Sequence, residues 1–188
     1  MYSTFRQHLE QIISVTDQEF EHILSHFTIR KYKKHQFVVQ PGNLVDHEYF
    51  VLGGLLKASL FSEQGREHII QFAMENWWVT DYQAFTTKMP ATLSIDCIEA
   101  VELLSISYED KQMICAASHK MEHFFRIKTT SGYISLQQRV LSLMNDDAQS
   151  RYQQLFQKYP VLFQRLPKSV IASYLGVSRE TLSRMSII

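Results

Sequence analysis

The sequence predicts an α+β protein, in which an N-terminal antiparallel β jelly roll or barrel with flanking helices precedes a helical C-terminal part. Between about residues 28 and 106, short runs rich in β-branched and aromatic residues alternate with turns such as Gly53–Gly54. Several short strands at this spacing are typical of an antiparallel barrel or jelly roll. Beyond Ser107 the apolar residues recur at helical spacing, which predicts helices to the end of the chain.

The composition is that of a folded globular chain. Of the 188 residues, 45% are hydrophobic and 20% are charged, whereas disordered chains are poor in apolar residues. No apolar run approaches the roughly 20 residues of a membrane span, and the N-terminus lacks the apolar core of a signal peptide. We therefore expect a cytoplasmic protein with no membrane partner. Two cysteines are too few for a disulfide framework or a four-cysteine metal site, and no metal or cofactor is predicted.

Short helices are predicted on either side of the β region. Residues 3–13 and 16–26 show helical spacing. Thr16 followed by Glu19 has the spacing of a capping box, in which each side chain bonds the backbone N–H of the other residue. Residues 108–117 fit a further short helix after the last strand.

A long helix is predicted at residues 120–144, which contain no proline. A stripe along it steps alternately by three and four residues, which is the repeat of a helix–helix seam. The stripe consists of Phe124, Ile127, Ser131, Ile134, Gln138 and Leu141. Its serine and glutamine weaken the seam, and Gly132 weakens the helix by about 1 kcal/mol relative to alanine. From periodicity alone, the helix either packs on its own barrel or pairs with a second copy of the chain.

The C-terminal segment has the pattern of a helix-turn-helix. Residues 146–159 predict one helix, and Pro167 can open the next because its missing N–H costs nothing in a first turn. Gly176 permits a tight turn, and Ser178 is a good N-cap for the helix that follows. That helix turns Leu182 inward and leaves a polar face outward.

The polar face carries side chains that suit DNA. Arginine can donate two hydrogen bonds to guanine, and glutamate can accept one from cytosine. Residues 147–188 hold six basic and two acidic residues and so carry +4, whereas residues 1–146 carry −4. The candidate DNA contacts are Lys168, Ser169, Ser178, Arg179, Glu180, Thr181, Ser183 and Arg184. The alternative is a solvated helical hairpin that packs on the barrel.

The segment 171–184, IASYLGVSRETLSR, resembles the recognition motif of the Crp/Fnr family of bacterial transcription regulators. The segment 50–72, FVLGGLLKASLFSEQGREHIIQF, resembles the family's barrel core, and the resemblance extends over nearly the whole chain. The chain is most similar to short regulators common in Bacteroidetes. The resemblance implies a cyclic-nucleotide-binding-like effector domain at 1–118, a dimerisation helix at 119–145 and a helix-turn-helix DNA-binding domain at 146–188. The implied partners are double-stranded DNA and a second copy of the chain, with RNA polymerase and an unknown small-molecule effector as further candidates.

The resemblance also implies individual roles. It places base contacts at Arg179, Glu180 and Arg184 and phosphate contacts at Lys168 and Ser169. In the family a wing follows the recognition helix. Only four residues follow Arg184 here, so we expect the wing to be absent or truncated.

The effector pocket departs from the family's pattern for cyclic nucleotides. The family's Gly-Glu-Leu element falls on Thr80–Tyr82, and the element that begins with its phosphate-binding arginine falls on Ala91–Leu93. Without that arginine a phosphate loses its bidentate partner, and Asp81 would repel it, so we expect no tight binding of cyclic AMP or cyclic GMP. The candidate pocket residues are Trp77, Trp78, Asp81, Tyr82 and Thr92. Their aromatic rings either fill a ligand-free core or admit a small apolar molecule.

Other functional classes find little support in the sequence. No cysteine precedes Cys97, so the family's iron–sulfur sensor is not expected. No nucleophile or metalloenzyme motif is present, and no enzyme is predicted. The sequence therefore predicts a homodimeric, sequence-specific DNA-binding transcription regulator with a degenerate effector pocket. The alternative is a ligand-sensing or protein-interaction module in which a small apolar molecule occupies the barrel.

Overall fold

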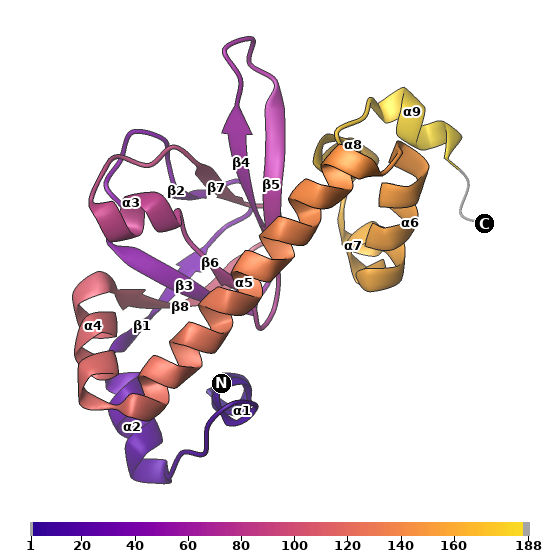
Figure 1. Ribbon diagram of the computed structural model, residues 1–188. Helices are drawn as coiled ribbons and strands as arrows, with labels where there is room; N and C mark the ends of the chain where they lie inside the picture. Colours follow the sequence, from indigo (N-terminus) through magenta and orange to yellow (C-terminus); the bar gives the residue numbers. More distant parts are fainter. Residues whose placement is uncertain (1, 186–188) are drawn as a thin grey trace. The chain divides into compact units, whose positions relative to one another are not determined.

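The computed structural model describes residues 2–185 (Figure 1). The first elements are α1 (Ser3–Glu10), α2 (Asp17–Ser25), β1 (Phe27–Tyr32), β2 (Phe37–Val39), β3 (His47–Gly53), β4 (Leu56–Phe61), β5 (Glu67–Ala73), β6 (Trp78–Val79) and α3 (Tyr82–Thr87). The later elements are β7 (Ser94–Cys97), β8 (Val101–Ser107), α4 (Tyr108–Ala117), α5 (His119–Asn145), α6 (Ala148–Lys158), α7 (Pro160–Arg165), α8 (Lys168–Leu175) and α9 (Arg179–Arg184). This order confirms the predicted α+β class. The expected absence of a wing concerns residues after Met185 and lies outside the described part of the chain.

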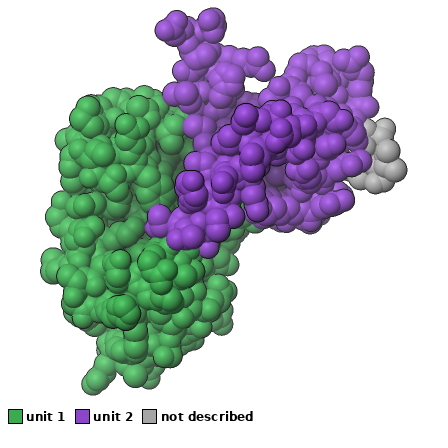
Figure 2. All heavy atoms as spheres, viewed as in Figure 1, with its two compact units in different colours: residues 1–59, 72–128 green, residues 60–71, 129–188 purple. Residues whose placement is uncertain are grey.

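The chain divides into two compact units (Figure 2). Unit 1 comprises residues 1–59 and 72–128, and unit 2 comprises residues 60–71 and 129–188. The outer part of the β4–β5 hairpin therefore belongs to the same unit as the second half of α5 and the C-terminal helices. The predicted long helix is α5, which passes from one unit into the other.

The described strands form two four-stranded sheets, with the orders β1-β8-β3-β6 and β2-β7-β4-β5. Strand β8 lies between two antiparallel neighbours, so that Ile106 is paired with Phe27 on one side and with Glu48 on the other. The turn between β3 and β4 requires glycine, as the predicted break at this point indicates. Gly54 has φ +93, and a Cβ atom there would lie 2.3 Å from the carbonyl oxygen of Ala100.

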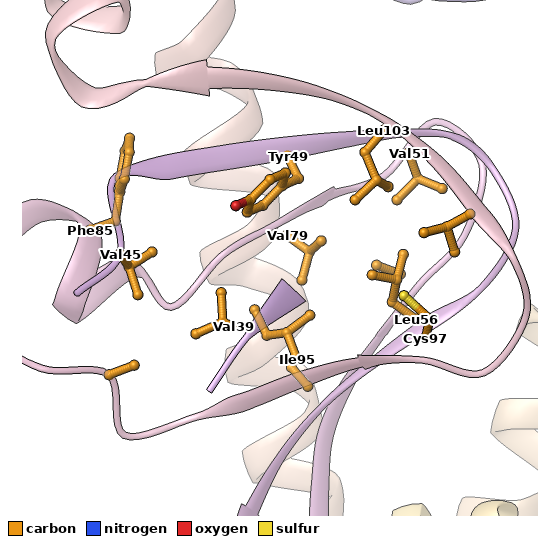
Figure 3. Packing of buried hydrophobic residues seen from close by; sticks show 14 of the residues in the cluster. Val39, Val45, Tyr49, Val51, Leu56, Val79, Phe85, Ile95, Cys97 and Leu103 are labelled. Atoms are coloured by element: carbon orange, nitrogen blue, oxygen red, sulfur yellow. The ribbon is translucent and has the colours of Figure 1, made fainter. Parts of the chain in front are cut away.

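The interior between the sheets is filled by apolar side chains (Figure 3). The buried members are Val39, Val45, Tyr49, Val51, Leu56, Ala58, Ala73, Val79, Ala84, Phe85, Ala91, Ile95, Cys97, Val101 and Leu103. In Figure 3, side chains from β3 and β8 point toward those from β4 and β7. Each fully buried leucine, valine or phenylalanine contributes about 1.5–3 kcal/mol, so this interior is a major source of stability.

A second apolar core covers the other face of the sheet β1-β8-β3-β6. Successive side chains of a strand point to opposite faces, so Phe50 and Leu104 turn away from the interior that Tyr49 and Leu103 fill. The helices α1, α2 and α4, the segment between α1 and α2, and the first turns of α5 pack on this face. The buried members of this core are Phe5, Leu9, Ile13, Phe20, Ile23, Phe50, Leu104, Ile106, Ile114, Met121, Phe124 and Phe125.

Two sequence-based assignments change in this second core. Phe124, predicted at the helix seam, is fully buried against Trp78, His8 and Phe125 because the start of α5 packs on the sheet of its own unit. Phe124 is therefore not available to a second chain. Trp78, predicted to line the pocket, also lies on this face, because the alternation of strand β6 turns Val79 into the barrel instead.

His8 makes the stability of this core sensitive to acid. The side chain is 5% exposed, and its Nε2 atom accepts a hydrogen bond from Trp78 Nε1 at 3.2 Å. Burial, and to a lesser extent the charge of Lys128, lowers the pKa of His8 from 6.5 to about 4. An unfolded chain binds this proton near pH 6.5 and the folded chain does not. Stability is therefore lost as the pH falls from 6.5 toward 4, by up to about 3 kcal/mol.

Urea unfolding at pH 7 and pH 4.5 measures this loss. The variant His8→Gln keeps an acceptor for Trp78 but does not titrate. Between these two pH values its free energy of unfolding should fall by about 2 kcal/mol less than that of the wild type. The variant His22→Gln, at an exposed histidine, should follow the wild type. The same pH dependence in His8→Gln and wild type would contradict this account.

Candidate nucleic-acid interface

The predicted helix-turn-helix is formed by α8 and α9. Gly176 ends α8 in the left-handed conformation at φ +73, and the N–H of Val177 donates to the carbonyl oxygen of Ala172 at 3.0 Å. The Ser178 hydroxyl then caps α9 by accepting a hydrogen bond from the N–H of Thr181 at 3.1 Å. The glycine and the serine that the sequence marked thus define the turn between the two helices.

The two helices share a buried face with α6 and α7 in unit 2. Helix α8 packs on both α9 and α6. The buried side chains are Tyr152, Leu155, Leu162, Leu166, Ile171, Ala172, Leu175 and Leu182. Leu182 anchors α9 with only 4% of its surface exposed, and burial of such a side chain is worth about 1.5–3 kcal/mol. This anchor sets which face of α9 points outward.

The outward face of α9 is polar. Arg179, Glu180, Ser183 and Arg184 are exposed and line one shallow depression. Hydrogen bonds from its own backbone N–H and from the N-cap serine lower the pKa of Glu180, so its carboxylate is an ionised acceptor at neutral pH. Two guanidinium groups and one carboxylate are therefore presented together, as a set of donors and an acceptor.

The other predicted DNA contacts lie at the starts of the two helices. Lys168 and Ser169 are exposed in the first turn of α8. Ser178 is exposed as well, but its hydroxyl is engaged as the cap of α9. Thr181 is half-buried, and its hydroxyl lies 3.1 Å from the hydroxyl of Ser178.

The predicted pocket residues are not brought to one site. Trp77 packs against the barrel core, whereas Trp78 lies on the opposite face of the sheet. The Tyr82 hydroxyl donates a hydrogen bond to the buried carboxylate of Glu48, which also pairs with Lys111. Each of these three aromatic side chains therefore has a separate structural environment.

Asp81 and Thr92, the remaining two pocket residues, contact each other. Asp81 is 2% exposed, and its Oδ1 atom caps α3 by accepting from the N–H of Ala84 at 3.2 Å. Its Oδ2 atom accepts from the N–H groups of Thr92 and Leu93 at 2.9 and 3.0 Å and from the Thr92 hydroxyl at 3.3 Å. Burial opposes ionisation, but the backbone donors of Leu93, Ala84 and Thr92 outweigh it and lower the pKa of Asp81. A carboxylate thus occupies these backbone donors.

The second half of α5 carries more exposed apolar residues than the predicted seam. The exposed members of that seam are Ser131, Ile134, Gln138 and Leu141, and Ile127 is half-buried. A second stripe, which the sequence analysis missed, consists of Tyr133, Leu136, Val140 and Leu143. It steps by three, four and three residues, so the same periodicity would have found it on another face of the helix.

Two arginines that the sequence analysis also missed hold the end of α8. Arg139 donates to the carbonyl oxygen of Tyr174 at 2.7 Å, and Arg151 donates to that of Leu175 at 3.1 Å. The partners are 35 and 24 residues apart in the chain. No local pattern marks either arginine, because such contacts exist only once the helices have packed.

The described residues contain neither a candidate metal site nor a candidate membrane span. Within residues 2–185, no group of three His, Cys, Asp or Glu side chains is placed to hold a metal ion. Nor does any helix in that range have the length and apolarity to cross a membrane.

Comparison with known proteins places this geometry in a family. A family model described as the cyclic nucleotide-binding domain matches residues 29–129, more than half of the chain. No curated protein matches significantly. FixK2 from Bradyrhizobium japonicum has a TM-score of 0.73 at 15% identity, over 85% of this chain and 82% of that one. CLP, a c-di-GMP-responsive global regulator from Xanthomonas campestris, has a TM-score of 0.69 at 17% identity, over 88% and 87%.

A third solved structure, a transcriptional regulator of the Crp/Fnr family from Eubacterium rectale, has a TM-score of 0.71 at 15% identity and covers 91% of this chain. At such identities the likeness concerns the fold, from the β barrel through the long helix to the helix-turn-helix. The family model independently matches the barrel and the first part of α5. The chain therefore belongs to the cyclic nucleotide-binding domain family and has the fold of the Crp/Fnr regulators.

Proposed function

We propose that this chain is a transcription regulator that binds a specific double-stranded DNA site as a homodimer and needs no cyclic nucleotide. The observation that carries the proposal is the exposed polar face of α9, where Arg179, Glu180, Ser183 and Arg184 lie opposite a buried leucine anchor. In this role the effector domain is 1–118, the dimerisation helix is 119–145 and the DNA-binding domain is 146–188.

Direct readout by α9 in the major groove accounts for specificity. The guanidinium groups of Arg179 and Arg184 can each donate two hydrogen bonds to guanine, and the Glu180 carboxylate can accept one from cytosine. Lys168 and Ser169 contact phosphate groups, which position the helix without reading the sequence. The charge of +4 on the C-terminal segment favours this approach to DNA.

A second copy of the chain suits the exposed half of α5. The exposed apolar side chains there are Tyr133, Ile134, Leu136, Val140, Leu141, Leu143 and Met144. Ile134 and Leu141 are seven residues apart, which is one heptad, so two copies of α5 can pack along them. A two-fold dimer would present two α9 helices to half-sites about 34 Å apart. RNA polymerase is a further partner that this role implies.

The structure of the effector barrel argues against a cyclic nucleotide. The backbone donors of Thr92 and Leu93, in the element that begins with a phosphate-binding arginine in the family, are already bound by the carboxylate of Asp81. Ala91 stands where the family has its phosphate-binding arginine, and it is buried in the apolar core. A nucleotide phosphate would meet a negative charge and find neither the guanidinium nor the free amides that it needs.

The alternative of a sensor for a small apolar molecule has less support. The barrel interior is packed with aliphatic and aromatic side chains from both sheets (Figure 3). A ligand would have to displace these side chains, and densely packed interiors resist such changes. The predicted pocket aromatics also lie in separate environments. We infer that the chain acts by binding DNA and not by catalysis.

Replacement of Arg179 by alanine should cost about 1–3 kcal/mol of operator affinity and relax selection at one base pair in each half-site. Selection from random duplex DNA by wild type and variant measures both effects. Lys168→Ala should instead weaken binding to all sequences alike and reduce the salt slope by about 1 for each subunit.

The control for these variants is Arg126→Ala, at an exposed arginine of α5 outside the helix-turn-helix. It should leave operator affinity and base preference unchanged. An equal loss of affinity on every sequence in Arg179→Ala would argue against base readout. No enriched sequence with the wild-type protein would refute the proposed function.

The double variant Ile134→Asp/Leu141→Asp should convert the dimer to a monomer in analytical ultracentrifugation, because two charges in an apolar seam cannot be buried without partners. Its helix content should be unchanged, and its operator affinity should fall because only one half-site is then held. The control Ser135→Asp lies on the same helix outside both apolar stripes and should remain dimeric. A wild-type protein that is monomeric at micromolar concentration would exclude the dimer.

Calorimetric titration of the wild type with micromolar cyclic AMP or cyclic GMP should give no saturable heat. The comparison is Asp81→Ala/Ala91→Arg, which frees the backbone donors and supplies a guanidinium group. This variant should bind cyclic nucleotide at least tenfold more tightly than the wild type. Saturation of the wild type would overturn the proposal of a degenerate pocket.

A further inference from the structure

The C-terminal end of α8 is held by side chains from outside the helix-turn-helix. Carbonyl groups in the last turn of a helix lack intrahelical donors. Arg139 in α5 supplies a donor to Tyr174, and Arg151 in α6 supplies one to Leu175. The guanidinium of Arg151 also donates to the carbonyl oxygen of Asp146 at 2.6 Å, so it joins the end of α8 to the link between α5 and α6.

Arg139 differs from Arg151 because it also binds the β4–β5 hairpin. The same Nη2 atom that donates to Tyr174 donates to the carbonyl oxygen of Ile69 in β5 at 2.9 Å. The guanidinium carbon lies 3.5 Å from the centre of the Tyr174 ring, so the planar group stacks on that ring. One half-buried side chain therefore joins three elements of unit 2: α5, β5 and α8.

A second hydrogen bond joins the hairpin directly to α8. The Ser173 hydroxyl donates to the carbonyl oxygen of Glu67 in β5 at 2.7 Å. The carbonyl groups of Glu67 and Ile69, two residues apart in β5, accept these bonds. Ser173 of α8 donates the first, and Arg139, which also bonds the neighbouring Tyr174, donates the second. The hairpin and α8 are thus held at two neighbouring points, which fixes their relative orientation better than one contact would.

The position of this contact matters because α9 follows at once. Tyr174 is two residues before Gly176, and the capped turn leads directly to Arg179. A shift at the end of α8 is therefore passed on to the exposed face of α9. On the other side, β4 continues into the barrel, where Leu56–Ser59 pair with β7.

We propose that Arg139 is a positioning residue for DNA recognition: by tying β5 to the end of α8, it makes the orientation of α9 depend on the β4–β5 hairpin. The proposal rests on the proposed function, since it concerns how the recognition helix is aimed. Arg139 touches neither base nor phosphate in this role.

The test compares Arg139→Lys, Ser173→Ala and Arg151→Lys by hydrogen exchange and by affinity for the operator that the wild type selects. Lysine keeps the charge but loses the planar group that stacks and donates to two carbonyls. Arg139→Lys should speed exchange at least fivefold in both the hairpin (62–71) and the turn (173–178). Its operator affinity should fall about tenfold with unchanged base preference and salt slope, because no base or phosphate contact is lost.

The other variants separate positioning from general destabilisation. Arg151→Lys should speed exchange at the turn but not in the hairpin, because Arg151 bonds the carbonyl groups of Asp146 and Leu175, neither of which lies in the hairpin. Ser173→Ala should speed exchange in the same two segments as Arg139→Lys. The double variant should lose little more operator affinity than the more affected single variant, because the effects of residues that act at one contact are not additive. Arg126→Lys, the same change at an exposed site of α5, should alter neither measurement.

Two results would overturn the proposal. One is unchanged operator affinity in a folded Arg139→Lys protein. The other is faster exchange at the turn with no change in the hairpin. If the wild type selects no DNA sequence, the proposed function fails and the positioning role fails with it. If the wild type selects an operator that Arg139→Lys binds equally well, only the positioning role fails.

Discussion

Regular secondary structure leaves some backbone N–H and carbonyl groups without partners. In this protein, side chains in the barrel and in the C-terminal helices are placed to bond these groups. A buried N–H or carbonyl group without a hydrogen bond costs free energy, so folded chains supply partners from side chains. Asp81 satisfies the N–H groups of Thr92 and Leu93. Arg139 satisfies carbonyl groups of β5 and α8. Ser178 satisfies the first turn of α9. Each of these residues lies where the barrel or the helix-turn-helix would otherwise leave a donor or acceptor unpaired.

The same constraint acts differently in the two units. In the barrel the carboxylate of Asp81 binds the N–H donors that an anionic ligand would need, and apolar side chains fill the interior. In unit 2 the exposed face of α9 is not needed to hold the helix in place, because Leu182 on the opposite face is buried. The N–H groups of Thr92 and Leu93 are bound by Asp81, whereas the guanidinium groups of Arg179 and Arg184 are exposed to solvent. This contrast is what favours a DNA-binding role over a nucleotide-binding one.

Helix α5 shows how one element can serve two purposes in different turns. Its first turns bury Met121, Phe124 and Phe125 in the core of unit 1. Its later turns expose apolar residues and direct Arg139 toward the hairpin and α8. The apolar residues of α5 are therefore buried in a core at one end and exposed at the other.

Features that depend on neighbouring residues could be predicted from the sequence alone. These include the Thr16 capping box, the extent of α5 and the turn between α8 and α9, since their hydrogen bonds join residues a few positions apart. The resemblance of 171–184 to a known motif supplied the expected DNA contacts. The burial of Phe124 and Trp78 in a core, and the bond from Arg139 to a strand 70 residues away, could be found only from the packing of distant elements. Periodicity defines the faces of a helix or strand but not what covers each face. That depends on long-range packing, in which residues distant in the chain compete for the same apolar surface and the same unpaired backbone groups.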